Sequence, residues 1–107
     1  MDTATKVPIL NSAPGKPKGS SKKKQQVSLT WAAPSTPNGT SAPNDYVIQY
    51  RLKGKSAWTT FKDGKSTAKK ATVKKLKSGK TYQFRVVPKN WAGTGKASAV
   101  SANIKVK

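Results

Sequence analysis

Apolar and polar residues alternate along several short segments of the chain. In the clearest segment, Val27, Leu29 and Trp31 alternate with Ser28 and Thr30. Successive side chains of a strand point to opposite faces, so this alternation predicts a β-strand with one apolar face and one polar face. The same pattern predicts strands over residues 46–51, 71–76, 82–87 and 104–106, and a short strand is expected over 57–61.

Turn-forming residues separate these segments. Pro34 to Asn44 holds three prolines and an Asn-Gly pair, and Lys89 to Lys96 holds two glycines. Asp63-Gly64 is a further turn signal. Short alternating strands at this spacing predict an all-β, antiparallel sandwich or barrel.

The first part of the chain differs in composition from the rest. Ser12 to Ser21 is rich in Gly, Pro, Ser and Lys, which is typical of linkers and turns. We therefore expect a linker or inter-module junction over residues 1–15 and one domain over 16–107. The three lysines at 22–24 are compatible with a loop or with a solvated edge strand, so the position of the first strand stays open.

The charge of the chain is strongly positive. Twenty-two Lys and Arg face three acidic residues, giving a net charge of +19. This excess keeps a protein soluble, and it also attracts polyanions such as nucleic acid, anionic cell-wall polymers or acidic glycans. Only Arg51 and Arg85 are arginines, which disfavours base-specific nucleic-acid recognition. A charge introduced by engineering would also explain the excess of Lys. The candidate polyanion patch consists of Lys62, Lys65, Lys69, Lys70, Lys74, Lys75, Lys77 and Lys80.

The residue inventory argues against catalysis. The chain has no His, Cys or Glu, so the usual general bases and the thiolate nucleophile are missing. Asp45 and Asp63 fall in predicted turns, and the ligand clusters of zinc and calcium sites are absent. We expect no enzyme activity and no cofactor. No apolar run approaches the ~20 residues that span a bilayer, so we expect no membrane insertion.

Four stretches together resemble the fibronectin type III family. They are Val27–Pro34, with its Trp and Pro; Tyr46–Arg51; Ala71–Val86, with Leu76, Gly79 and Tyr82; and Asn90–Ser98. The resemblance covers roughly residues 25–107 and implies an immunoglobulin-like, seven-stranded antiparallel β-sandwich. It also implies that Tyr82 forms the tyrosine corner of that fold. The core it implies is Val27, Leu29, Trp31, Tyr46, Ile48, Tyr50, Ala71, Val73, Leu76, Tyr82, Phe84, Val86, Ile104 and Val106.

The resemblance is strongest to the bacterial branch of this family. It implies a noncatalytic, extracellular or cell-surface module, a spacer or display domain with weak adhesion in a larger secreted or surface protein. Its partners would be neighbouring domains of that protein, and the module itself would be a monomer. The loop between the last two strands lacks the Arg-Gly-Asp of some animal members, so integrin binding is not carried over.

Protein recognition through loops is a further hypothesis. The resemblance places the Pro34–Asn44 and Lys89–Lys96 loops at the same end of the sandwich. Trp91, flanked by Asn90, and Asn38 in the other loop are the candidate contact residues. An exposed Trp can anchor a protein interface or stack on a sugar, although Trp91 could also fold back over the sandwich. Trp58 is expected to pack partly against the sheet.

Overall fold

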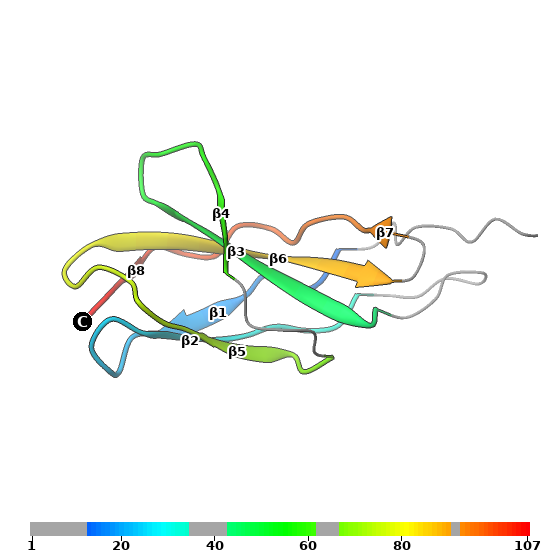
Figure 1. Cartoon of the computed structure of the whole chain (residues 1–107), viewed down its shortest axis with the longest axis horizontal. Helices are drawn as coiled ribbons and strands as arrows, with labels where there is room; N and C mark the ends of the chain where they lie inside the picture. The colour runs from blue at the N-terminus through cyan, green and yellow to red at the C-terminus, as the bar shows by residue number, and fades with distance from the viewer. Residues whose placement is uncertain (1–12, 35–42, 62–66, 91–92) are drawn as a thin grey trace, which may run out of the picture.

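The computed structural model describes residues 13–34, 43–61, 67–90 and 93–107, and all regular structure in these ranges is β-strand (Figure 1). The strands are β1 (Lys18–Ser20), β2 (Val27–Thr30), β3 (Asp45–Leu52), β4 (Thr59–Phe61), β5 (Lys70–Val73), β6 (Thr81–Asn90), β7 (Gly93–Thr94) and β8 (Ile104–Lys105). Within these ranges there is no helix long and apolar enough to cross a membrane.

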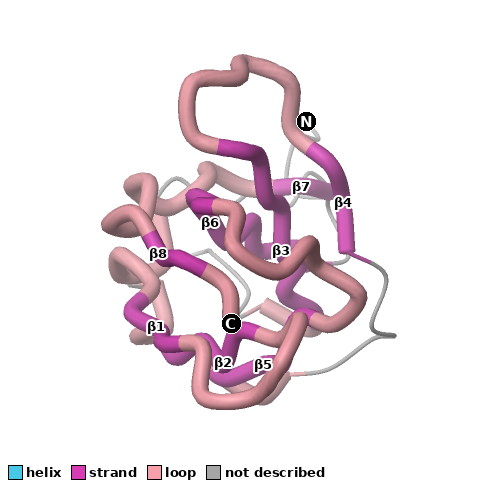
Figure 2. The backbone as a smooth tube through the Cα atoms, turned by 90° about the vertical axis from the view of Figure 1, so that its left-hand side faces the viewer, coloured by secondary structure: helices cyan, strands magenta, loops and turns pink. Residues whose placement is uncertain are grey.

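The strands form two antiparallel sheets that face each other (Figure 2). One sheet has three strands in the order β1-β2-β5, and the other has the order β4-β3-β6-β7, with β8 also pairing with β6. The predicted all-β, immunoglobulin-like sandwich is therefore confirmed. The described residues hold eight strands instead of seven because the last part of the chain pairs with β6 in two short pieces, β7 and β8.

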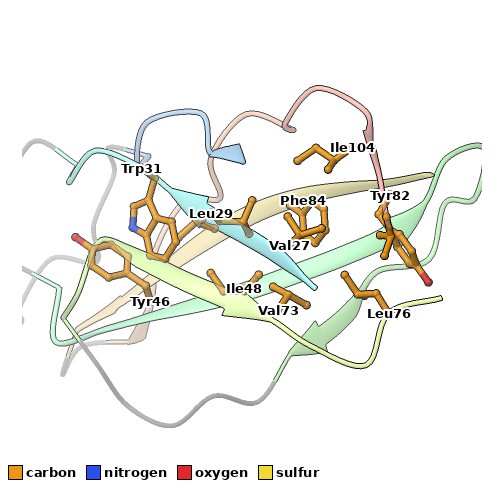
Figure 3. Close-up of a cluster of buried hydrophobic side chains, with 12 residues drawn as sticks. Val27, Leu29, Trp31, Tyr46, Ile48, Val73, Leu76, Tyr82, Phe84 and Ile104 are labelled. Atoms are coloured by element: carbon orange, nitrogen blue, oxygen red, sulfur yellow. The ribbon is translucent and has the colours of Figure 1, made fainter. Parts of the chain in front are cut away.

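The inward residues of both sheets form one core between the layers (Figure 3). Val27, Ile48, Phe84 and Val86 have no exposed surface. Twelve of the fourteen core residues that the family resemblance implies are buried; the other two, Tyr50 and Ala71, are half-buried and pack against the cluster. Strict alternation along β6 would place Val87 on the outer face, opposite to Val86, but Val87 is also buried.

The first strand lies at Lys18–Ser20 and pairs with β2. Alternation could not locate it because all three residues of β1 are exposed, while the neighbouring Pro17 is fully buried. A Cβ on Gly19 would stand 2.5 Å from the carbonyl oxygen of Ser28, so only glycine allows this close pairing. The lysines at 22–24 lie in the loop between β1 and β2, where Lys23 forms a bend and Lys24 a turn.

Two serines attach the segment between β7 and β8 to β6. Ser98 and Ser101 are buried, and their Oγ atoms accept hydrogen bonds from the N–H groups of Val86 and Phe84, each at 2.9 Å. Their own N–H groups donate back to the carbonyls of the same two residues at 2.8 Å. This edge of the sheet is thus held by paired backbone and side-chain bonds where a regular ladder is missing.

The predicted tyrosine corner is present. The hydroxyl of Tyr82 accepts a hydrogen bond from the N–H of Lys77 at 3.0 Å, and its ring is almost fully buried beside Leu76 (Figure 3). The N–H of Leu76 donates to the carbonyl of Gln25 at 3.1 Å. These bonds fix the connection between β5 and β6 at one end of the sandwich, while Trp31 and Tyr46 pack edge to face at the other end (Figure 3).

Candidate functional site

Trp58 lies just before β4, within reach of the chain's two guanidinium groups. The Cζ atom of Arg51 is 4.3 Å from the centroid of the Trp58 ring, and that of Arg85 is 4.4 Å away. Cations at this distance are attracted by the negative face of an indole ring. We call these three residues the Arg–Trp–Arg stack.

Two glutamines hold the guanidinium groups of the stack in place. Arg51 Nε donates to Gln83 Oε1 at 3.0 Å, and Arg85 Nε donates to Gln49 Oε1 at 2.6 Å. Both bonds join residues that face each other across β3 and β6. The inward positions of these strands are taken by core residues, so the alternation of side chains places all four of these polar residues on the outer face of the sheet.

The stack gives the outer face an ordered group of donors. Gln49 Nε2 also donates to Thr60 Oγ1 on β4 at 3.5 Å, so the polar array extends over three strands. Each guanidinium has five N–H donors, of which the Nε bond uses one. The remaining donors form a planar fork that suits carboxylates, next to an aromatic ring that suits apolar or planar groups.

The described lysines of the predicted polyanion patch all lie along one continuous segment. Lys70 belongs to β5, the edge strand of the three-stranded sheet, and Lys69 precedes it. The others lie in the connection to β6: Lys74, Lys75, Lys77 and Lys80. All six are exposed, whereas Lys62 and Lys65 lie outside the described residues. The edge strand and the connection that follows it thus carry a series of exposed cations.

The predicted loop contacts have a different outcome. Asn90 is the last residue of β6, pairs with Gly93 and is 6% exposed. Its side chain is therefore not available as the exposed loop contact that the sequence suggested, because the strand continues farther than the alternation indicated. Trp91 and Asn38 lie outside the described residues.

Few titratable groups other than lysine occur in the described part of the chain. Its one acidic residue is Asp45, whose Oδ1 accepts a hydrogen bond from the N–H of Tyr46 at 2.9 Å. Burial raises the pKa of Tyr46 above its usual value. No group of three or more His, Cys, Asp or Glu gathers among these residues.

Sequence reasoning placed Trp58 partly against the sheet but missed the two arginines that lie over it. Only part of the signal, the position of the arginines on their strands, was present in the sequence. The only two arginines of the chain both occupy outward positions of long strands, each opposite a glutamine in the register. The partner of each arginine depends on that register, which no local pattern determines.

A comparison with protein families now agrees with the fold. The sequence profile described as Fibronectin type III domain matches residues 12–104. The chain belongs to the fibronectin type III family. As a fibronectin type III domain, it carries the Arg–Trp–Arg stack on the outer face of the sheet that contains β3 and β6.

Similar fibronectin type III sequences occur in much longer animal proteins. The chain is 30% identical over 95 residues to the juxtamembrane domain-associated catenin of Caenorhabditis elegans, covering 89% of this chain and 8% of that protein. It is 33% identical over 78 residues to chicken myosin-binding protein H, covering 73% and 14%. Titin module A71 from human cardiac muscle has a TM-score of 0.76 at 30% identity, with 91% of both chains covered. The chain thus spans a small part of these two curated relatives.

Proposed function

We propose that this fibronectin type III domain is a noncatalytic module of a larger protein, which it serves as a spacer and as a protein-recognition domain. The Arg–Trp–Arg stack carries the proposal. Aromatic residues and Arg are enriched where proteins bind proteins, and here hydrogen bonds to Gln49 and Gln83 already order the two arginines. Less side-chain entropy is then lost on binding.

The names of two relatives agree with a role in protein binding. One is a myosin-binding protein and another is a catenin associated with a juxtamembrane domain. Each contains a region similar to this chain as a small part of its length, which supports a modular role for the chain. Neither of these partners is transferred to this protein.

Site-specific photo-crosslinking tests this proposal. A benzoylphenylalanine at Thr60, on the outer face beside the stack, is expected to give covalent adducts with partner proteins when the domain is in its native setting. The same group at Ser28, an exposed position on β2 in the opposite sheet, is the matched control. Adduct formation that is absent at Thr60, or equal at both positions, would contradict protein recognition by this face.

A second candidate function is polyanion binding along β5 and the connection to β6. The observation that favours it is the continuous series of exposed cations from Lys69 to Lys80. Nonspecific binding of this kind needs only lysines and depends steeply on salt. Affinity for duplex DNA should fall with a log–log salt slope near −0.9 for each phosphate neutralised. Binding to DNA, heparin or teichoic acid that does not change with salt would exclude it.

Several finer assignments stay predictions. They are the bacterial subtype, an extracellular or cell-surface location, a monomeric state, the boundary between a linker over 1–15 and the domain over 16–107, and recognition through the two loops. The relatives named above are animal proteins and lend no support to the bacterial subtype. Near the expected boundary between residues 15 and 16, Pro14 is buried and the N–H of Gly15 donates to the carbonyl of Ala32. These two residues of the expected linker therefore contact the domain.

A further inference from the structure

A pocket of about 350 Å³ opens beside the tyrosine corner. It lies between the end of β3, the β3–β4 loop and the connection from β5 to β6. The β3–β4 loop projects from the body of the sandwich on this side (Figures 1 and 2). The apolar lining of the pocket comes from residues that pack in or against the core: Tyr50, Leu52, Leu76 and Tyr82. Such a pocket has the concave, apolar character of a ligand site.

Cations surround this apolar surface. Lys55 lines the pocket from the β3–β4 loop, and Lys75 and Lys77 line it from the opposite connection. All three lysines are exposed, and none of the described residues that line the pocket is acidic. A ligand that places carboxylates beside its apolar group would therefore complement the charge around the pocket.

The walls of the pocket are held in place before any ligand binds. On one side, the N–H groups of Leu76 and Lys77 are bonded to the Gln25 carbonyl and the Tyr82 hydroxyl. Lys75 has a positive φ of 62°, a conformation that non-glycine residues keep only where the surrounding structure imposes it. On the other side, the N–H of Lys53 donates to the carbonyl of Thr81 at 2.9 Å. A preorganised site loses less entropy on binding.

The strand next to the pocket favours a peptide as the ligand. Thr59 lines the pocket and belongs to β4, the edge strand of its sheet. Within the described part of the chain, β4 pairs with β3 alone, and an edge strand of this kind can pair with the backbone of an extended peptide. A glycan or a nucleic acid has neither a matching backbone nor an aliphatic side chain for the apolar lining.

We infer that this pocket binds an acidic peptide segment of a partner protein, with one bulky apolar side chain inserted and carboxylates beside the lysines. The inference rests on the proposed protein-recognition function and adds a ligand class and a second site to it. The outer-face stack and the pocket are separate surfaces, although Arg51 borders both.

Two labelled peptides test the inference by fluorescence anisotropy in 0.15 M NaCl. Both carry the acidic frame Gly-Asp-Glu-X-Glu-Asp-Gly, with Phe at X in one and Ser in the other. The Phe peptide should bind about tenfold more tightly, because burial of a Phe ring contributes roughly this factor or more. Equal binding of the two peptides would overturn the inference, since it would leave charge as the only source of affinity.

Matched variants locate the binding to this pocket. Ala57→Trp fills the pocket from an exposed position and should remove the preference for Phe. The control is Ala102→Trp, also at an exposed position, which fills another pocket of about 290 Å³ between β1 and β8; β1 and β8 lie on the side of the sandwich away from β4 (Figure 2). It should leave the preference intact. The opposite result, or an equal effect of both variants, would overturn the inference.

The charge contribution is tested in the same way. Lys55→Glu with Lys77→Glu should weaken the Phe peptide at least fivefold more than Lys16→Glu with Lys18→Glu, a pair that changes the net charge equally and lines the other pocket. Equal weakening would indicate nonspecific attraction and would overturn the inference.

An NMR titration of the unmodified chain needs no variant to fold. The Phe peptide should shift the amide signals of Ala57, Thr59 and Lys77 more than those of Gly19 and Ala102; the reverse would overturn the pocket assignment. The two proposals can also fail separately. Adducts at Thr60 without any Phe preference would refute the pocket alone, and a Phe preference without adducts would refute recognition by the outer face alone.

Discussion

At the scale of single residues, the ends of the core depend on two tyrosines that have different surroundings. The Tyr82 hydroxyl accepts a hydrogen bond from the N–H of Lys77, so it fixes a turn in addition to filling space. Tyr46 is 6% exposed and packs edge to face against Trp31, with ring centroids 5.6 Å apart. Removing either hydroxyl leaves an almost isosteric phenylalanine, which separates the polar contribution from the packing.

Replacement of Tyr82 by Phe should lower the free energy of unfolding by about 1 kcal/mol, because the Lys77 N–H loses its acceptor in a partly buried place. Urea unfolding followed by tryptophan fluorescence measures the change. Tyr50→Phe is the control. The ring of Tyr50 is half-buried, and its centroid lies 5.8 Å from the ring centroid of Tyr82 on the neighbouring strand. A loss as large for Tyr50→Phe as for Tyr82→Phe would contradict the special role of the corner.

Tyr46 should make stability depend on pH in the alkaline range. Burial raises the pKa of Tyr46 in the folded state, whereas in the unfolded chain this pKa stays at about 10. The unfolded state then releases its proton first as the pH rises. The contribution is fully present below pH ~10 and is lost as the pH rises through the folded pKa.

Lysines titrate in the same range, so the informative quantity is the difference in unfolding free energy between the unmodified chain and Tyr46→Phe. Urea titrations at pH 8, 9, 10 and 11 should show the unmodified chain losing stability relative to the variant above pH ~10. A difference that stays constant across this range would show that Tyr46 ionises equally in both states.

At the scale of elements, the segment after β7 replaces a regular strand by serines that bond to β6. Three N–H groups of this segment, spaced three residues apart, donate hydrogen bonds to backbone carbonyls of β6. They belong to Gly95, Ser98 and Ser101. The Oγ atoms of the two serines satisfy the N–H groups of Val86 and Phe84. Buried N–H groups without partners are costly, so these serines are structural despite being small and polar.

Ser101→Ala should therefore destabilise the domain by about 1–3 kcal/mol, because the buried N–H of Phe84 loses its side-chain acceptor. Thermal and urea unfolding of the variant measure the loss. Ser28→Ala, at an exposed position of β2, is the control and should change stability by less than about 0.5 kcal/mol. If both variants had the same stability, the Ser101 bond would contribute nothing net.

The sequence allowed prediction of the elements whose side chains alternate, of the short strand β4 within residues 57–61, and of the tyrosine corner. Alternation located β2, β3, β5, β6 and β8 because one face of each is buried. It could not find β1, where a buried Pro17 and a close approach at Gly19 replace an apolar face. It also missed the serine-anchored segment, since period three is neither a strand nor a helix signal.

The candidate sites were harder to predict because they depend on register and on connections. The Arg–Trp–Arg stack exists because Arg51 faces Gln83 and Arg85 faces Gln49 across β3 and β6, a pairing between residues more than thirty positions apart. The cationic segment was predictable because it is continuous in sequence. The apolar pocket beside it needed the relative positions of three separate segments.

At the scale of the whole molecule, a net charge of +19 is spread over a small sandwich. Every described lysine is exposed, so the charges do not compete with the core. They do repel one another, and this repulsion favours the expanded, unfolded chain. Screening therefore links the solution conditions to the stability of the entire domain rather than to one contact.

Raising sodium chloride from 10 to 150 mM shortens the screening length from about 30 to about 8 Å, so the melting temperature should rise. The melting temperature of the Lys16→Glu, Lys18→Glu variant should rise by less. The net charge of this variant is +15, because each change lowers the charge of +19 by two.

Sodium sulfate at matched ionic strength distinguishes general screening from binding. If the melting temperature rises equally in chloride and in sulfate, the salt screens the whole surface. A larger rise in sulfate would indicate a specific anion site. If charge reversal at Lys74 and Lys77 abolishes that larger rise, while charge reversal at Lys16 and Lys18 does not, the site lies on the segment after β5. A melting temperature that falls with salt would mean that attraction, not repulsion, dominates the charges of this domain.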